Sequence, residues 1–542
     1  PKPASRRANK PHSPVGLAMK LWIHSLLATF TVLIGGCGGG DSSSRGSSRT
    51  LIYARGSDAQ KLDPGDVDDG ESVKPLNQMC EGLLRFKPGT LELEPWLAES
   101  YSVSDDGLTI TFQIRDGVVF HDGTPLNAEA AAWSFQRQMD KEHPGHLPGS
   151  IFQYWNFLYS EVERVTVDGP MTLTMHLSQP NATLLFSLAT VSSYLISPKS
   201  LDDYGQDMVL HPVGTGPYKF VSWEPNQAII MERNEHYWSE PAGYDRLVMK
   251  SVTENAVRLL DLKAGKIDGL DGLQPAEIQP LINDPQFDVY HKPGMNFAYI
   301  AFNETAERLR DPEIREAIFK AIDREKLVRV ALDGMGEVAH FPMAKGMLGE
   351  PAEFDPVAYD PDAARAVLSK YADRWTTPIV ISVMNAPRLY APDPVNIISL
   401  IREDLKQVGL PVEVEVRDFK NHLHQTRNGR HEIGFLGWHG DNGDPDNFLS
   451  IHLSSWAAKM GGATNISFYK NPVMDRLLID ARKVTDLDER QRLYEEVLTI
   501  WRRDLPLLPL VHGEDIVVFR SNIEGFVPSK TSDIFLGPVR PK

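Results

Sequence analysis

The feature that most constrains the fold is an alternation of strand and helix patterns between residues 297 and 501. Short apolar runs at residues 378–384, 412–416 and 431–438 are typical of strands. Each run is separated from the next by a stretch long enough for a helix. Strands that alternate with helices favour a lobe of the α/β class, in which helices cover the faces of a sheet.

The helices in this part of the chain are predicted from their starts. Asp311-Pro312, Asp360-Pro361 and Asn471-Pro472 each place an Asx residue before a proline. The Asx side chain caps free backbone N–H groups, and proline fits the first helical position. A further helix is expected over residues 394–408, because Gly409 is a usual residue just after a helix end.

The earlier part of the chain is richer in strands and turns. Residues 51–55 are predicted as the first strand, and residues 108–114 alternate with period two. A helix is expected over residues 127–139, and a hairpin around Asp168-Gly169. With 542 residues, of which 42% are hydrophobic, the chain is long enough for two or three domains with a large core.

The N-terminal 36 residues have the pattern of a signal peptide. Five basic residues accompany a mostly apolar stretch at residues 21–34. Gly35 and Gly36 fit a peptidase cleft, and the thiol of Cys37 fits lipid attachment. The string LIGGC resembles a bacterial lipobox, so Cys37 is predicted to be the lipidated first mature residue. Residues 37–50 would then be a lipidated cysteine and a flexible Gly/Ser tether.

Two other interpretations of this segment fit its residues less well. A retained transmembrane anchor is disfavoured, because the apolar run is short for the roughly 20 residues that span a bilayer. A twin-arginine signal at Arg6-Arg7 is discounted, because Asn9 and Lys10 stand where such signals carry apolar residues. Cys80 is expected to be a small buried hydrophobe, so no disulfide framework is predicted.

Charge and motif content exclude several function classes. The net charge of −17 disfavours nucleic acid as a partner, because phosphate contacts need Lys or Arg. The sequence has no HExxH string, no Walker loop and no G-x-S-x-G elbow. Gly214 and Gly216 are flanked by prolines and are expected to shape a turn near a hinge. Neither a cofactor nor a metal site is predicted.

Six strings along the chain point to a family. Residues 98–135 contain FQIRDGVVFHDGTPLNAEAAAWSF, which resembles the signature of the dipeptide/oligopeptide/nickel class of solute-binding proteins of bacterial ABC importers, the family 5 type. PVGTGPYKF, MERNEHYW, LKAGKIDGL, DPEIREAIFKAIDREKLV and DLKQVGLPVEV resemble family strings in the expected order. Within this class, residues 77–100 and 437–448 are most similar to the dipeptide-binding members.

The resemblance implies an α/β, two-lobed periplasmic-binding-protein-like fold of type II, with an extra subdomain and lobes joined by a hinge. Lobe I would cover residues 51–292, with the extra subdomain at about 86–210. Lobe II would cover residues 293–510, and residues 511–542 would return to lobe I. It further implies an extracytoplasmic, lipid-anchored monomer that is not an enzyme. Closure of the lobes would capture short peptides, and dipeptides in particular, and the protein would deliver them to a permease that is driven by an ATPase.

The charges at the two ends of a dipeptide determine which side chains a dipeptide-binding site must contain. A dipeptide is a zwitterion, so its recognition needs a fixed anion and a fixed cation roughly 7 Å apart. Arg388 follows the strand predicted at residues 378–384, and Asp441 follows the strand predicted at residues 431–438. Ligands of open α/β sheets bind outside the carboxyl ends of strands. Arg388 can hold a carboxylate bidentately, and Asp441 can accept from an ammonium. The resemblance assigns these roles to the matching residues.

Four neighbours complete the predicted site. Tyr390, Gly437 and Trp438 would line the same cleft, and His439 stands where the resembled proteins carry a smaller polar residue. Alternatives stay open at this point. Arg388 is equally typical of a solvated loop arginine, and Trp438 at a strand end fits a core as well as a cleft.

The acidic and histidine-rich strings allow other chemistry. Asp441, Asp444 and Asp446 are typical turn formers, and their spacing, interrupted by Pro445, departs from a calcium loop. His422, His424, His431 and His439 would suit nickel or haem, although His422 and His424 precede a strand and are expected to be exposed. The rival functions are binding of longer peptides, glutathione-like peptides, haem or nickel. More remote are a secreted metallohydrolase using His439 and Asp441, and a structural lipoprotein without a ligand.

Overall fold

The computed structural model describes residues 49–542. The predicted signal peptide, the lipidation of Cys37 and nearly all of the tether lie outside the described residues. Within residues 49–542, none of the helices combines the length and the apolar character that a bilayer span requires.

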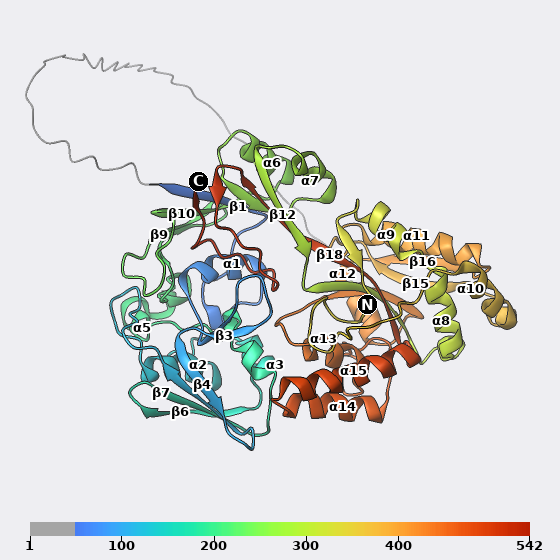
Figure 1. Cartoon of the computed structure of the whole chain (residues 1–542), viewed down its shortest axis with the longest axis horizontal. Helices are drawn as coiled ribbons and strands as arrows, with labels where there is room; N and C mark the ends of the chain where they lie inside the picture. The colour runs from blue at the N-terminus through green and yellow to red at the C-terminus, as the bar shows by residue number, and fades with distance from the viewer. Residues whose placement is uncertain (1–48) are drawn as a thin grey trace, which may run out of the picture. The chain divides into compact units, whose positions relative to one another are not determined.

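One large sheet organises this part of the chain. Its strands follow the order β16-β15-β17-β13-β18-β11-β1-β10-β9-β8, and β12 and β14 also pair with β18. The strand β18 (Leu507–Arg520) pairs with β13 (Asn296–Phe302) through its first half and with β12 (Phe287–Pro293) through its second. In Figure 1, β12 and β18 run side by side between the blue-green and the yellow-orange groups of elements.

The first group of elements is built on β1 (Thr50–Arg55), in agreement with the strand predicted there. β1 pairs in parallel with β10 and with β11. The other elements of this group are β2 (Leu84–Phe86), β3 (Leu93–Pro95), β8 (Tyr218–Glu224), β9 (Ala228–Arg233), β10 (Arg246–Ser251), β11 (Gly269–Asp271), β19 (Ile523–Glu524), β20 (Arg540–Pro541), α1 (Gly70–Met79), α5 (Lys199–Tyr204), α6 (Asn255–Lys263) and α7 (Pro275–Ile282), with short 3-10 helices at Pro64–Asp66, Val191–Ser193 and Gly205–Leu210.

A separate four-stranded sheet has the order β4-β5-β7-β6 and its own buried cluster of side chains. It consists of β4 (Ala98–Val103), β5 (Thr109–Ile114), β6 (Val162–Gly169) and β7 (Thr172–Leu177), and it is accompanied by α2 (Ala128–Met139), α3 (Gln153–Leu158) and α4 (Leu184–Ser187). The helix predicted at residues 127–139 is confirmed, with the Asn127 side chain accepting from the backbone N–H of Ala130. The hairpin turn comes slightly later than predicted, because β6 continues through Gly169.

The second group of elements contains the predicted alternation of strands and helices. Its elements are β13, β14 (Gly336–Val338), β15 (Ile379–Met384), β16 (Val412–Arg417), β17 (Ile433–His439), α8 (Pro312–Ala321), α9 (Arg324–Ala331), α10 (Pro361–Leu368), α11 (Pro394–Gln407), α12 (Phe419–Arg427), α13 (Asp446–Leu453), α14 (Pro472–Lys483) and α15 (Leu487–Asp504), with 3-10 helices at Glu307–Leu309 and Ser369–Trp375. The three predicted Asx-Pro starts are confirmed: Asp311, Asp360 and Asn471 each cap the following helix. Gly409 has a φ of +87°, as its place after α11 requires.

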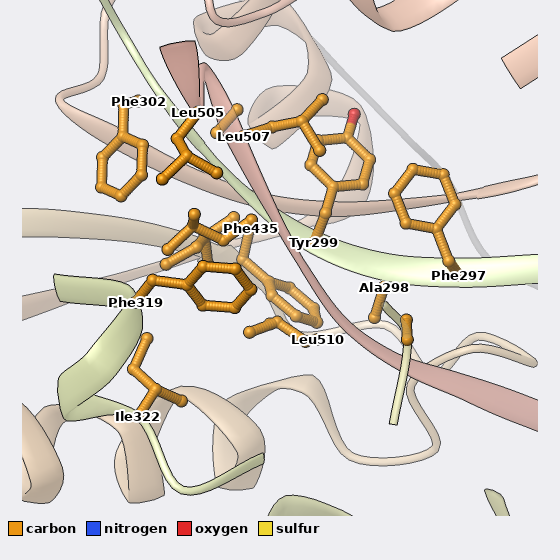
Figure 2. Packing of buried hydrophobic residues seen from close by; sticks show 14 of the residues in the cluster. Phe297, Ala298, Tyr299, Phe302, Phe319, Ile322, Phe435, Leu505, Leu507 and Leu510 are labelled. Carbon is orange, nitrogen blue, oxygen red and sulfur yellow. The ribbon is translucent and has the colours of Figure 1, made fainter. Parts of the chain in front are cut away.

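The core of the second group is arranged around β13. All seven residues of this strand are buried, because β17 and β18 pair with its two edges and side chains cover both faces. Figure 2 shows Phe297, Tyr299 and Phe302 of β13 beside Leu505, Leu507 and Leu510 of the α15–β18 region. The lobe boundaries given above stay predictions. The chain passes between the two groups of strands at the β12–β13 connection and within β18.

The prediction that His422 is exposed is wrong. His422 lies in α12, which packs on β15, and its side chain is fully buried with Nε2 at 2.8 Å from the carbonyl oxygen of Phe435. Only His424 of this pair is exposed. The segment before β17 is a packed helix rather than a solvated connection, and one of its faces is therefore buried. Cys80 is buried and free, as predicted.

His452 of α13 generates a prediction about acid stability. Burial lowers the pKa of His452 to about 3, and its ring packs against Phe297, Tyr299 and Trp438. The unfolded chain takes up the proton near the ordinary histidine pKa, so stability falls as the pH drops below about 6.5. Between pH 7.5 and pH 5, the unfolding free energy of the parent should fall by more than that of His452→Phe. We expect the two decreases to differ by up to about 2 kcal/mol.

Urea unfolding at the two pH values measures this difference, with His424→Phe as the matched control at an exposed position. An identical pH dependence in His452→Phe and in the parent would contradict the assignment.

Candidate ligand-binding cleft

A cavity of about 690 Å³ lies beside the middle of β18. One wall comes from α1 and the segments after β1 and β11 of the first group of elements, together with α3 of the four-stranded subdomain. The opposite wall comes from the segments that follow β15 and β17, and Glu514 to Val517 of β18 complete the lining. A cavity of this size suits a small ligand.

Four of the six predicted ligand-binding residues line this cavity: Arg388, Tyr390, His439 and Asp441. Their common position has a topological cause. β15 and β17 pair in parallel, with Ile381 opposite Ile433, so their carboxyl ends meet at one edge of the sheet. The segments that leave these two ends therefore face the same space, as the strand-exit argument requires.

Arg388 is held in a tight turn in which its backbone exchanges two hydrogen bonds of 2.9 Å with Ala391. The guanidinium carbon lies 3.8 Å from the centroid of the Phe419 ring, and Nη1 donates to the carbonyl oxygen of Pro387 at 3.1 Å. Within residues 49–542, no carboxylate forms an ion pair with Arg388. The Arg388 side chain also interacts with the Tyr390 hydroxyl, and its other donors are available to an anionic group in the cavity.

Asp441 is held by hydrogen bonds from its neighbours and forms no ion pair within residues 49–542. Oδ2 accepts from Asn447 Nδ2 at 3.1 Å, and the backbone N–H of Asp441 donates to Asn447 Oδ1 at 2.9 Å. The Tyr154 hydroxyl, which comes from α3 on the opposite wall, donates to Oδ1 at 3.4 Å. Burial raises the pKa of Asp441, while the bond from Asn447 and the charge of His439 act in the other direction. A cationic ligand group would stabilise the ionised form.

Gly437 and Trp438 are not among the residues that line the cavity. Gly437 is covered by the Tyr390 ring, and a Cβ at this glycine would lie 2.3 Å from Tyr390 Cδ2. The Trp438 indole packs against the core, and its Nε1 donates to Asn447 Oδ1 at 3.1 Å. Both residues therefore position cavity residues from behind: Gly437 makes room for Tyr390, and Trp438 holds the amide that orients Asp441.

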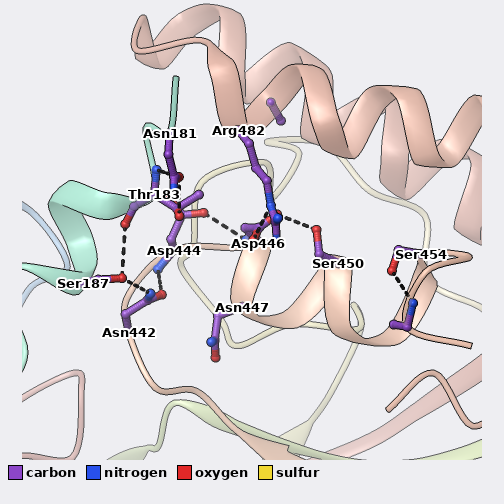
Figure 3. A network of polar contacts seen from close by, with 12 residues as sticks. Asn181, Thr183, Ser187, Asn442, Asp444, Asp446, Asn447, Ser450, Ser454 and Arg482 are labelled. Carbon is purple, nitrogen blue, oxygen red and sulfur yellow. Dashed lines mark hydrogen bonds and ion pairs between the residues drawn. The ribbon is translucent and has the colours of Figure 1, made fainter. Parts of the chain in front are cut away.

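Asp444 and Asp446 are not among the residues that line the cavity. Asp444 pairs with the buried Arg490 at 2.7 Å, and Asp446 pairs with Arg482 at 2.7 Å. Figure 3 shows Asp446 between Arg482 and Ser450. Their carboxylates are thus engaged in structural ion pairs, and no group of three or more His, Cys, Asp or Glu residues within 49–542 is placed to hold a metal ion.

The loop that carries Asp441 also touches the four-stranded subdomain. Asn442 Nδ2 donates to Ser187 Oγ of α4 at 3.0 Å, which Figure 3 shows, and the backbone N–H of Ala182 donates to the carbonyl oxygen of Arg482 at 2.6 Å. Together with the Tyr154–Asp441 bond, these contacts join the four-stranded subdomain to the second group of elements.

The wall built by the first group of elements was not predicted from the sequence. Asp69, Val73 and Asn77 of α1 line it at intervals of four residues, together with Lys74. Tyr154 and Asp533 also line the cavity. Asp69 is a usual residue before a helix, which could have indicated α1, but nothing in the pattern shows which helix face borders a cleft.

A sequence model of the bacterial extracellular solute-binding proteins, family 5 Middle, matches residues 92–459. The chain belongs to this family. It is similar to heme-binding protein A of Haemophilus influenzae, with 30% identity over 96% of this chain and 99% of the relative. It is also similar to the dipeptide-binding protein of Escherichia coli, with 28% identity over 88% of this chain and 92% of the relative.

A solved structure supports the fold. The ABC transporter-associated periplasmic binding protein DppA from Helicobacter pylori, in complex with the peptide STSA, has 29% identity and a TM-score of 0.73 over 91% of this chain and 98% of that one. The chain therefore has the two-lobed periplasmic-binding-protein fold. It is an extracytoplasmic solute-binding protein of the ABC-importer class rather than an enzyme, and the metallohydrolase alternative is set aside.

The contact between Gly437 and Tyr390 gives a direct test of how the cavity wall is held. We expect Gly437→Ala to lower the unfolding free energy by about 1–3 kcal/mol, because the added methyl group forces the Tyr390 ring to move. Gly462→Ala is the matched control, since a Cβ there meets no atom within 4 Å. Thermal and urea unfolding of the two variants give the comparison. Equal stability of the two variants would show that Tyr390 is not packed on Gly437.

Proposed function

We propose that this chain captures short peptides, dipeptides first, and delivers them to the permease of an ABC importer. The proposal rests on two side chains of opposite charge that border the same cavity. Arg388 and Asp441 line one cavity, and within residues 49–542 neither forms an ion pair with a side chain of opposite charge. A partly buried charge without a partner is costly, and a zwitterionic ligand supplies both partners at once.

The chemistry of the two groups fits the two ends of a peptide. The planar guanidinium of Arg388 binds a carboxylate through two parallel N–H donors, which a lysine cannot reproduce. Asp441 has acceptor capacity left after the bonds from Asn447 and Tyr154, so it can accept from an ammonium. Closure of the lobes around the ligand would exclude water and strengthen both pairs.

Two relatives support a peptide as the ligand. The similar protein from Escherichia coli is named a dipeptide-binding protein, and the similar protein from Helicobacter pylori was solved with the peptide STSA. The similarity to heme-binding protein A makes haem a second candidate. His439 is the one histidine that lines the cavity among the described residues, and it would have to supply the axial ligand.

We expect Arg388→Ala and Asp441→Ala each to weaken dipeptide binding by roughly 2–5 kcal/mol, because each leaves one charged end of the ligand buried without its partner. Arg388→Lys should recover only part of the loss, since the ammonium lacks the planar fork. Calorimetric titration with dialanine measures the effect, and Arg402→Ala on the exposed side of α11 is the control. Unchanged affinity in both alanine variants would refute the assignment, and tight haem binding that requires His439 would favour the second candidate.

We further propose that Cys37 anchors the mature chain to a membrane through lipid and that the protein acts as a monomer. The apolar stretch and the LIGGC string support the anchor. We expect Cys37→Ser to move the protein from the membrane fraction to the soluble fraction of cells and to remove the lipid mass from the intact protein. Mass spectrometry of both fractions gives the result. A lipid adduct that persists in Cys37→Ser would contradict this proposal.

A further inference from the structure

The cavity has an excess of acidic over basic side chains. Eight Asp or Glu residues line it, against three Lys or Arg residues. A zwitterionic dipeptide would bring one positive and one negative end and would leave this excess unchanged. The field in a cleft with one prevailing sign of charge selects ligands of the opposite sign.

Two of the three bases are already engaged by the protein. Lys74 Nζ pairs with Glu71 Oε1 at 2.7 Å and with Asp271 Oδ2 at 2.9 Å. The buried Arg258 donates to the carbonyl oxygen of Gly272 at 3.0 Å and to Asn255 Oδ1 at 2.7 Å. Arg388 is thus the base that remains for a ligand carboxylate. Glu71 also pairs with Arg55 at 3.8 Å, and Glu514 lies 2.9 Å from His291. Asp68, Asp69 and Asp533 form no ion pair within residues 49–542, so these three residues make the wall opposite Arg388 acidic.

That wall follows one face of α1. Asp69 caps the helix, with Oδ1 accepting from the backbone N–H of Ser72 at 2.9 Å, and the other oxygen, Oδ2, is buried without a hydrogen-bond partner within residues 49–542. Two turns later, Asn77 Nδ2 donates to Asp533 Oδ1 at 2.9 Å. The two carboxylates therefore stand at the two ends of the same stripe along the cavity.

A second observation points to a ligand with hydrogen-bond donors. Asn77 is 5% exposed and Asp271 is 8% exposed, and both line the cavity. In the part of the chain that the structure describes, neither Asn77 Oδ1 nor Asp271 Oδ1 has a hydrogen-bond donor. A buried acceptor without a donor costs free energy, and a donor on the ligand removes this cost.

From these contacts we propose that the preferred ligand is a peptide with net positive charge, whose lysine or arginine side chain lies along α1 between Asp69 and the Asn77–Asp533 pair. The inference rests on the proposed peptide-binding function. Arg388 and Asp441 hold the termini, and the basic side chain satisfies the acceptors of the α1 wall. Acidic peptides and ligands with net negative charge are disfavoured by the same wall.

Calorimetry with matched peptides tests this inference. Ala-Lys and Lys-Ala are compared with the same peptides carrying norleucine in place of lysine, and with Ala-Glu and Glu-Ala, at low salt. We expect the better lysine peptide to bind about tenfold more tightly than its norleucine counterpart, and the glutamate peptides to bind more weakly than both. The preference should shrink as salt is added, because screening weakens charge pairs in an accessible cleft.

Two variants locate the effect. Asp69→Asn keeps a good helix cap while it removes the charge, and Asp533→Asn keeps an acceptor for Asn77. Each should lower the ratio of lysine to norleucine affinity about threefold or more. Asp105→Asn, at an exposed position between β4 and β5, should leave the ratio as it is in the parent.

The outcomes separate the inference from the function on which it rests. Equal affinity for lysine and norleucine peptides, or a lysine preference that both cleft variants retain in full, overturns the inference alone. Failure of every peptide to bind removes the proposed function and this inference with it. A lysine preference that falls in the two cleft variants and persists in Asp105→Asn supports both.

Discussion

The strand β18 is the constraint on which the rest of the structure depends. Its first half pairs with β13 and its second half with β11 and β12, so one continuous backbone belongs to both groups of strands. The crossing point is fixed by Asn296, whose side chain donates to the carbonyl oxygen of Gly513 at 3.1 Å and accepts from its N–H at 2.9 Å. Both hydrogen-bonding groups of Gly513 are therefore satisfied by one buried amide.

The same crossing point positions one wall of the cavity. A Cβ at residue 513 would lie 2.2 Å from the carbonyl oxygen of Leu389, so only glycine lets the Arg388 turn approach β18 so closely. Glu514 to Val517, immediately after this glycine, line the cavity. The geometry that joins the two lobes and the geometry that presents Arg388 are thus set by the same few atoms. Arg388 is therefore positioned by the packing of its turn against β18, the strand that both lobes share.

The shared position of residues that follow β15 and β17 could be predicted from the sequence, because it depends only on local patterns and a general property of parallel strands. Arg388, Tyr390, His439 and Asp441 accordingly line one cavity. The same reasoning could not separate residues that face the cavity from those behind it, as Trp438 shows. The α1 wall was invisible for a different reason. Its place in the cavity follows from tertiary packing of segments far apart in the sequence, such as Asn77 and Asp533.

The carboxylates of the 441–446 loop are of two kinds, those that form ion pairs with the protein and one that is held only by hydrogen bonds. Asp444 and Asp446 are neutralised by Arg490 and Arg482 and fix the loop to α14 and α15. Asp441, a few residues earlier, is oriented by an amide and a hydroxyl, which hold the carboxylate without cancelling its charge. Rigidity and charge are therefore supplied by different residues. An ammonium group that entered the cavity would meet a carboxylate already in place, so little free energy would be spent on ordering Asp441.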